Sequence, residues 1–430
     1  MATLAATHTA QAGADLPTKR LFTLSCIALV VTSMTFAIRA GMLGTLGAEF
    51  ALDNRQLGVT AAMAGFGFPV ATVFGGLIYN RVGPRTIMMI AFFGHLLGLL
   101  LTIFSGGFWG LVVSTFFIGF ANGSVEAACN PMIANMYSNN KTTMLNKFHV
   151  WFPGGLVIGA LAAFAVQQLL GGEGRPTWQL EIAVMIVPTL VYGWMVFTTR
   201  FPDVVSDTSD QTDTVLNLRA MVSPLFIVMC LIMTVTAATE LGTNQWVGTL
   251  LEASGASPLI VLALVSTVMA LGRYFAGPLV HALNPTGVLL FSAVVTALGV
   301  FLLSSATGGL TYVAAVVFAI GITYFWPTMV GFIAEHKADT GALGMSVIGG
   351  AGMVGFTIWT PVIGGWIDAA TARAEAAGLS GDAVSLAAGQ DALGRILYFP
   401  LLLILAFGVL FVLRGRFAKT AGHAVHTPGV

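Results

Sequence analysis

Apolar stretches of about 20 residues follow one another along this 430-residue chain, and they constrain its fold more than any other feature. Each is long enough to cross the apolar core of a bilayer, which is about 30 Å thick. Only 8% of the residues are charged, against roughly 25% in soluble domains, which argues against a water-soluble core of this size. Inside lipid every crossing must be helical, because an open strand leaves its amides unpaired. The sequence therefore predicts an all-α membrane protein.

The apolar stretches predict twelve crossings. Their predicted bounds are residues 21–45, 56–79, 86–105, 108–136, 148–170, 178–199, 224–250, 258–279, 287–305, 310–333, 342–367 and 394–413. Lys and Arg collect in loops on the cytoplasmic side of a membrane. With both termini inside, twelve Lys and Arg of the loops and tails lie on that side and four lie outside. We therefore expect cytoplasmic termini in a multi-pass protein of the cell inner (plasma) membrane.

The composition changes in the middle of the chain, where residues 200–223 carry four Asp among Ser and Thr. Such a solvated segment predicts a cytoplasmic linker. We expect tails at 1–20 and 414–430, and six-helix bundles at 21–199 and 224–413. The bundles also repeat, since a shift of 201 positions places Gly76 over Gly277 and Pro84 over Pro285. Repeated bundles around a midplane site are the architecture of secondary transporters.

The loop after the second predicted span carries a family motif. It reads Gly76-Leu-Ile-Tyr-Asn80-Arg81-Val-Gly83-Pro84-Arg85 and resembles the major facilitator superfamily signature G-x-L-a-D-r-x-G-r-k. The resemblance implies twelve helices in two pseudo-symmetric bundles. Gly83 suits a tight turn with positive φ, and Arg81 and Arg85 suit helix carbonyl ends and acidic partners at the cytoplasmic face. Asn80 stands where the family has Asp, which weakens the charge-relay role of that position.

Four ionisable side chains lie well inside predicted spans: Arg39, Glu126, Glu240 and Arg273. Each costs about 2.5 to 3.5 kcal/mol at a helix centre, so they must pair or line water. The alternative is a set of static ion pairs that only fixes helix packing. In the superfamily the first, fourth, seventh and tenth helices line the cavity, so the resemblance implies that Arg39, Glu126 and Glu240 are substrate or proton-coupling residues. We expect Arg273 to be structural.

Three further segments resemble the branch of the superfamily that contains fucose:proton symporters and glucose/galactose transporters. They are Glu126-Ala-Ala-Cys-Asn130-Pro131, Glu240-Leu-Gly-Thr-Asn244-Gln245-Trp246 and Phe325-Trp326-Pro327-Thr328. The resemblance implies a sugar-type substrate. In that branch a carboxylate on the first helix shares the proton work, and ungapped matching puts Ala40 there, beside Arg39. A cation at this place suggests a different coupling arrangement or an anionic substrate such as a sugar acid, and the sequence leaves both open.

Planar amides and aromatic rings suit the hydroxyls and apolar faces of a sugar. The candidate substrate-binding residues are Asn130, Asn244, Gln245, Trp246 and Trp326. The alternative for the two Trp is packing or a place at the membrane interface. The alternative for Asn130 is satisfying backbone groups that Pro131 leaves free.

The function that these features favour is proton-coupled uptake, or alternatively sodium-coupled uptake, of a sugar or sugar derivative by a monomer. Loss of hydration favours a neutral carboxyl and a nearby Arg favours the charged form, so a Glu126 that gains and loses an Arg partner would bind and release a proton. Glu240 is the second candidate, with an Arg39 to Glu240 contact as an outer latch.

Two rival functions remain at this stage. The first is a proton-coupled exporter of drugs or metabolites, although the fifth span lacks the G-x-x-x-G-P-x-x-G-G pattern of many such antiporters. The second is a membrane sensor that binds a solute without moving it, which would normally add a soluble signalling domain. An organic-anion transporter is the variant of uptake that Arg39 suggests.

Other classes of function are excluded by what the sequence lacks. Its 18 basic and 18 acidic residues give no net charge for gripping nucleic acid. Its three Cys lie in apolar runs, which argues against disulfides and clustered metal ligands. No phosphate-binding loop and no catalytic set appear, so we expect neither a cofactor nor an enzyme.

Overall fold

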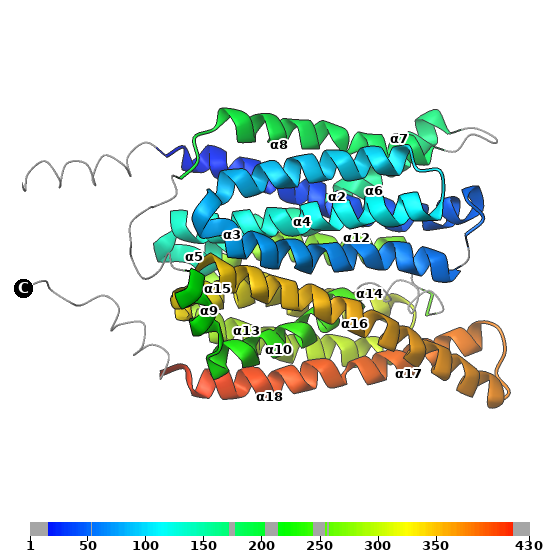
Figure 1. The fold of residues 1–430 in the computed structure, drawn as a ribbon. Helices are drawn as coiled ribbons and strands as arrows, with labels where there is room; N and C mark the ends of the chain where they lie inside the picture. Colours follow the sequence, from blue (N-terminus) through cyan, green and yellow to red (C-terminus); the bar gives the residue numbers. More distant parts are fainter. Residues whose placement is uncertain are drawn as a thin grey trace, which may run out of the picture.

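The computed structural model describes residues 16–52, 54–171, 177–202, 214–243, 254–255 and 258–415. Long helices run side by side through these ranges, within which no strand occurs (Figure 1). The predicted all-α class is therefore confirmed.

The helices fall into an N-terminal half, a linker helix and a C-terminal half. The N-terminal half contains α2 (Thr18–Glu49), α3 (Asn54–Ile103), α4 (Phe108–Met136), η1 (Ser138–Asn140), α5 (Lys141–His149), α6 (Trp151–Leu170), α7 (Trp178–Val184) and α8 (Ile186–Thr198). The linker contributes α9 (Thr214–Met221). The C-terminal half contains α10 (Pro224–Ala237), η3 (Ala238–Gly242), α12 (Pro258–Tyr274), α13 (Ala276–Leu303), α14 (Gly309–Ile322), α15 (Phe325–His336), η4 (Ala338–Thr340), α16 (Gly341–Ala376), α17 (Asp382–Ile396) and α18 (Tyr398–Val412).

These helices supply the twelve predicted crossings. In the described ranges ten helices are long and apolar enough to cross a membrane, and 260–274 is a shorter apolar helix. The second and third crossings are joined in α3 across a kink, which brings the number to twelve. The fifth, sixth, seventh, eighth, tenth and twelfth crossings each run over two consecutive elements.

The repeat predicted from sequence appears as a repeated turn. Gly83 has φ 74° and ψ 169°, and Asn284, which lies 201 positions later, has φ 54° and ψ 169°. Each is followed by a proline that begins the next crossing. The positive φ predicted for Gly83 is confirmed. At Asn284 the side-chain Oδ1 accepts hydrogen bonds from Thr286 and Gly287, which caps the new helix.

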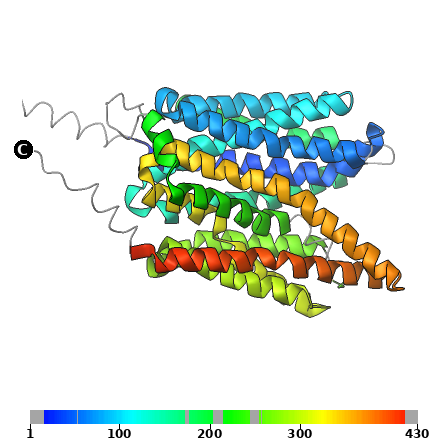
Figure 2. The same ribbon diagram turned by 60° about the horizontal axis from the view of Figure 1, so that its bottom comes forward.

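The two halves lie side by side with their helices roughly parallel (Figure 2). α5 and α9 lie at one end of the bundle, together with the start of α2 and the end of α18 (Figure 1). η1 contacts α5 and η4 contacts α9, so both lie at the same end. We call this end the linker end and the other the opposite end. Large apolar side chains such as Leu169, Trp194 and Leu405 are exposed on the outer faces of the helices, as expected of surfaces that contact lipid.

The repeated turn predicts unequal effects of substitution. Gly83→Ala places a side chain in a backbone region that is nearly restricted to glycine, and we expect it to cost about 1–3 kcal/mol. Asn284→Gly relieves the same strain but loses the helix cap, which costs only a few tenths of a kcal/mol, so we expect little net change. Thermal unfolding of the two purified variants in detergent tests this. Equal destabilisation by both would contradict it.

Candidate functional site

Glu126 lies at the centre of a polar cluster on α4. The Asn130 side-chain amide, one turn further along the helix, donates a 2.5 Å hydrogen bond to its carboxylate. The Trp326 indole N–H of α15 donates to the same carboxylate from the other half. His149 Nε2 lies 3.8 Å from Glu126 Oε2 and 3.2 Å from Asn130 Oδ1. Asn130 therefore holds the carboxylate rather than filling the backbone gap left by Pro131.

Arg273 joins this cluster to both halves through two carbonyls that prolines leave free. In a helix, the carbonyl of residue i accepts from the N–H of residue i+4, which proline lacks. Pro327 thus frees the Thr323 carbonyl, and Arg273 Nε donates to it at 2.7 Å. Pro153 likewise frees the His149 carbonyl in the N-terminal half, and Arg273 Nη1 donates to it at 3.1 Å. One guanidinium therefore ties the two halves together.

Glu240 receives the remaining arm of Arg273. Arg273 Nη2 donates a 2.6 Å hydrogen bond to Glu240 Oε1, and both side chains are buried. Glu240 lies in η3, a single π-helical turn within the seventh crossing, a feature that recurs at functional sites. The backbone N–H of Trp326, in the first turn of α15, also donates to Glu240. A carboxylate there satisfies a free N–H and complements the positive end of the helix.

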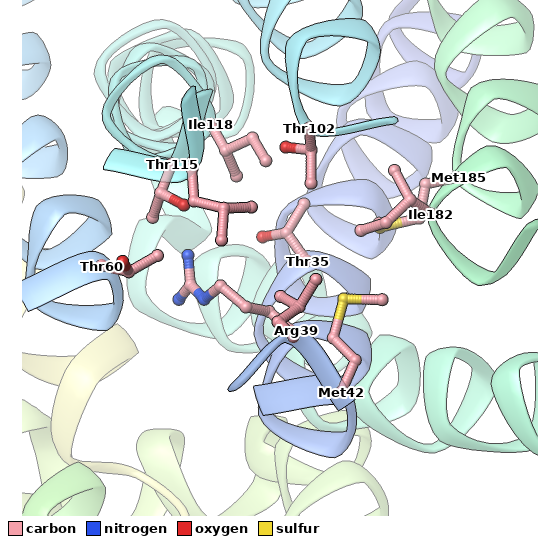
Figure 3. A pocket seen from close by; sticks show the side chains of 11 residues that line it. Thr35, Arg39, Met42, Thr60, Thr102, Thr115, Ile118, Ile182 and Met185 are labelled. Atoms are coloured by element: carbon pink, nitrogen blue, oxygen red, sulfur yellow. The ribbon is translucent and has the colours of Figure 1, made fainter. Parts of the chain in front are cut away.

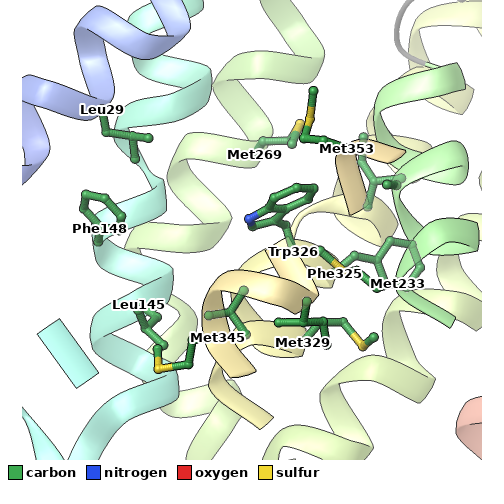
Figure 4. Packing of buried hydrophobic residues seen from close by; sticks show 14 of the residues in the cluster. Leu29, Leu145, Phe148, Met233, Met269, Phe325, Trp326, Met329, Met345 and Met353 are labelled. Carbon is green, nitrogen blue, oxygen red and sulfur yellow. The ribbon is translucent and has the colours of Figure 1, made fainter. Parts of the chain in front are cut away.

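Trp326 forms the apolar wall of the cluster. Figure 4 shows its indole beside Met269 and Met353, and its ring meets Phe68 of the N-terminal half edge to face at 6.5 Å. A Cβ on Gly352 would lie 2.5 Å from the indole, so α16 needs a glycine here for the ring to fit. Trp326 is 7% exposed. In this conformation its faces are packed by protein, while its N–H points to Glu126.

Burial makes the cluster sensitive to charge. Glu126, Asn130, His149, Glu240 and Arg273 are each at most 5% exposed. A charge out of water is stable only when a counter-charge and hydrogen bonds surround it. The cluster can therefore bind or release a proton only together with a rearrangement of its partners.

Arg39 lies apart from this cluster. Its side chain points into a small cavity of the N-terminal half, about 10 Å³ in volume, which is room for about one water molecule (Figure 3). Thr60 and Thr115 line the cavity beside the guanidinium, and the Phe36 ring lies 5.6 Å from it. Arg39 Nη1 is shielded from solvent and has no hydrogen-bond partner in the described part of the chain. The predicted Arg39 to Glu240 contact is not formed, because Glu240 binds Arg273.

The structure places the other predicted site residues as follows. Asn244, Gln245 and Trp246 lie outside the described residues. Gly76 lets α3 approach α16, since a Cβ there would lie 2.7 Å from that of Ser346. Arg81 is exposed near the linker end.

The remaining motif residues contact helix ends and the linker. Arg85 donates to the Phe197 carbonyl at the end of α8, the kind of contact predicted for it. Asn80 donates to Asn217 of α9 at 3.0 Å, and Asn217 donates to the Asp339 carbonyl of η4 at 2.9 Å. The linker helix therefore bridges the halves. The amide of Asn80 contributes an uncharged hydrogen bond to this bridge.

His149 is a site residue that the sequence does not predict. Arg273 is predicted to have a structural or gating role, but its partners in the site are not predicted. The sequence does contain a signal for the contacts of Arg273. Pro153 and Pro327 each lack the N–H that would bind the carbonyl four residues earlier in the chain, so these two carbonyls need another donor. Arg273 lies well inside a predicted span and has several donors. Arg273 reaches these two carbonyls because of how the halves pack against each other, and the sequence pattern does not reveal that packing.

Twelve crossings, two repeated halves and a buried polar cluster between them define the class of protein. This is the architecture of secondary transporters that move small solutes by alternating access. Residues 25–360 match the family model of the Major Facilitator Superfamily. The chain belongs to this superfamily and is a transporter rather than an enzyme.

Comparisons with individual proteins agree on the fold. The chain is 26% identical over 166 residues to the Xenopus tropicalis solute carrier family 2 facilitated glucose transporter member 10, a match that covers 39% of this chain. It spans only 29% of that relative's length. Among solved structures, the E. coli fucose:proton symporter has a TM-score of 0.67 at 16% identity, covering 90% of this chain and 98% of that chain. A proton:xylose symporter bound to 6-bromo-6-deoxy-D-glucose has a TM-score of 0.69 at 13% identity, covering 90% and 96%.

The two prolines allow a matched test of the Arg273 tie. Pro153→Ala restores an N–H that competes for the His149 carbonyl, and we expect it to weaken the tie between halves by about 0.5–1.5 kcal/mol, the net value of one hydrogen bond. Pro327→Ala competes for the Thr323 carbonyl, which lies in the same half as Arg273. Labelling of an Ala334→Cys probe by a soluble maleimide, with the native cysteines replaced, reports opening of the linker end. Labelling should be faster with Pro153→Ala than with Pro327→Ala, and the reverse order would contradict the assignment.

Proposed function

We propose that this transporter couples uptake of a small polar solute, a sugar or sugar derivative, to the entry of protons across the inner (plasma) membrane. The observation that carries the proposal is the charge count of the cluster. Two carboxylates, Glu126 and Glu240, lie in the electrostatic field of one guanidinium, that of Arg273, which is ion-paired with Glu240. In this buried site the set is neutral when it holds one proton and carries an uncompensated negative charge when it holds none.

The partition of these groups between the halves links the proton to movement. Glu126, Asn130 and His149 belong to the N-terminal half, while Arg273, Glu240 and Trp326 belong to the C-terminal half. When the halves rock, Glu126 loses the Trp326 N–H and moves away from Arg273. A charged Glu126 resists that separation and a neutral one allows it, so the proton on Glu126 controls the change between conformations.

The orientation proposed for the chain puts the linker end in the cytoplasm. Twelve of the sixteen Lys and Arg in loops and tails then lie inside. Hydrogen bonds join the halves at this end, among them Thr142 Oγ1 to Glu335 Oε1 at 2.6 Å and Lys141 Nζ to the Ala334 carbonyl at 2.9 Å. The conformation described here is thus one in which the cytoplasmic end is closed. Opening this end breaks those hydrogen bonds and releases solute and proton inside.

Recognition of a sugar is supported by the groups around Glu126. The Asn130 amide, the carboxylate and the Trp326 indole offer paired donors and acceptors beside an aromatic face. These groups satisfy one another here, so a solute hydroxyl would replace some of these contacts. The sequence likeness to a facilitated glucose transporter supports the same substrate class.

A second candidate substrate is a sugar acid or another organic anion, and Arg39 favours it. Arg39 has a buried N–H without a partner and, within the described residues, forms no ion pair. A carboxylate on the solute would supply the missing counter-charge.

Glu126→Gln tests the proton carrier. The amide keeps the shape of the side chain but holds no exchangeable charge, so proton-driven accumulation should be abolished while counterflow of the solute persists. Uptake into proteoliposomes with an imposed pH gradient measures proton-driven accumulation. Exchange of labelled solute at equal pH measures counterflow. Uphill uptake that survives in Glu126→Gln would rule Glu126 out as the carrier.

A panel of neutral sugars and sugar acids distinguishes the two substrate classes. If the solute is neutral, Arg39→Gln should change its apparent affinity by less than about threefold, a difference under about 1 kcal/mol. If the solute is a sugar acid, loss of a charge-assisted contact should weaken binding by about tenfold or more. Initial rates of uptake across a concentration series, with and without a pH gradient, give the apparent affinity of the unmodified protein and of Arg39→Gln for each solute. A preference for neutral sugars together with a tenfold loss in Arg39→Gln would fit neither class.

A further inference from the structure

A row of polar side chains runs from the cluster to the linker end, between the two halves. On α5 they are Thr142, Asn146 and His149, whose spacing of four and three residues places them on one face. Facing them on α15 are Thr328 and Glu335, seven residues apart. We call these five residues the polar seam. All except Glu335 are at most 2% exposed, and Glu335 is partly exposed at the linker end.

Hydrogen bonds link most of the seam. Glu335 Oε1 accepts from the Thr142 backbone N–H at 3.1 Å and from Thr142 Oγ1 at 2.6 Å. Asn146 Nδ2 donates to the Thr142 carbonyl at 2.9 Å and lies 3.4 Å from Thr328 Oγ1. At its inner end His149 Nε2 lies 3.8 Å from Glu126 Oε2. The seam thus spans the distance between the buried carboxylate and a carboxylate that reaches solvent.

The seam is more polar than packing requires. The Oδ1 atom of Asn146 and the Oγ1 atom of the neighbouring Thr143 are buried and have no hydrogen-bond partner in the described ranges. An unpartnered buried acceptor is costly, and such a group usually marks a place that water or a moving partner occupies in another state. Because α5 and α15 belong to different halves, opening of the linker end exposes this face of α5 to water.

We propose that the polar seam is the path by which the proton leaves Glu126, with His149 as the first acceptor and Glu335 as the last. This inference rests on the proposed function. The O–H bond of Glu126 breaks and an N–H bond forms at His149 Nε2. Nε2 has a lone pair for this proton when the hydrogen of the neutral ring lies on Nδ1 and the Asn130 amide is turned so that its N–H, instead of its Oδ1, faces Nε2. Once water fills the opened seam, His149 Nε2 releases the proton to that water. Glu335 then binds the proton before it passes to bulk solvent.

The charged groups around the seam suit this direction. Arg273 donates to the His149 carbonyl from α12, so a cation on the ring is held only briefly and passes its proton on. At the outer end Lys141 of α5 donates to the Ala334 carbonyl at 2.9 Å, beside Glu335. Glu126 on α4 faces the ring as well, with Oε2 3.8 Å from His149 Nε2.

The polar seam can be tested without a solute. The purified protein is exposed to a rapid pH jump in a stopped-flow instrument, and an indicator dye reports the rate at which the protein takes up protons. The phase that disappears in Glu126→Gln reports exchange at Glu126. His149→Ala and Glu335→Gln should each slow this phase about tenfold or more, the scale of losing a positioned proton acceptor. Glu335→Gln keeps an oxygen that accepts from Thr142, so the contact between halves is preserved. Glu375→Gln, an exposed carboxyl at the end of α16, is the control and should leave the rate unchanged.

Chemical rescue separates proton transfer from a purely structural role. Free imidazole should restore the rate in His149→Ala, which a structural histidine would not show. An unchanged Glu126 phase in both His149→Ala and Glu335→Gln would overturn the seam and leave Glu126 as the carrier. Absence of any phase that depends on Glu126 would instead overturn the proposed function, and the seam with it.

Discussion

The three-way contact of Arg273 is the interaction on which the rest of this structure depends. A guanidinium inside a membrane protein is stable only when its donors and its charge are satisfied. Here Glu240 supplies the charge, and two carbonyls freed by prolines supply acceptors. One carbonyl belongs to each half, so the requirement to satisfy one buried cation also holds the halves together. The breaks in the fifth and tenth crossings follow from the same two prolines.

This arrangement accounts for a site that is both stable and movable. The hydrogen bonds between the halves are individually modest, about 1 kcal/mol each, whereas separating a buried charge from its partner costs far more. In the proposed function, opening separates a charged Glu126 from Arg273 but a protonated Glu126 only from its hydrogen-bond partners, so the proton lowers the cost of opening. Trp326 connects the two carboxylates, since its indole N–H binds Glu126 and its backbone N–H binds Glu240. The linker helix adds a neutral contact through Asn80 and Asn217.

Much of the fold follows from the sequence, because lipid leaves few alternatives to helices of a fixed length. The crossings, the turn at Gly83 and its repeat near Pro285 needed only apolar length, glycine and proline. The partners of the buried charges were harder to predict. The same shift of 201 positions places Glu240 over Arg39, at the same depth of the membrane. The π-helical turn η3 changes the direction of residue 240, and a uniform helical period misses such a turn. His149 enters the site through its carbonyl as well as its ring, which residue type alone does not indicate.

The central claim is that one guanidinium, that of Arg273, balances only one of the two carboxylates, so Glu126 and Glu240 hold one proton between them. Infrared difference spectroscopy of the purified transporter with labelled glutamate measures this directly, through the carbonyl stretch of a neutral carboxyl group. We predict one buried neutral carboxyl near neutral pH, which is absent in Glu126→Gln. It should also be absent in Glu240→Gln, because the one remaining carboxylate then balances the charge of Arg273 without a proton. A spectrum of the unmodified protein without such a group, or a neutral carboxyl signal that persists in either variant, would contradict the account.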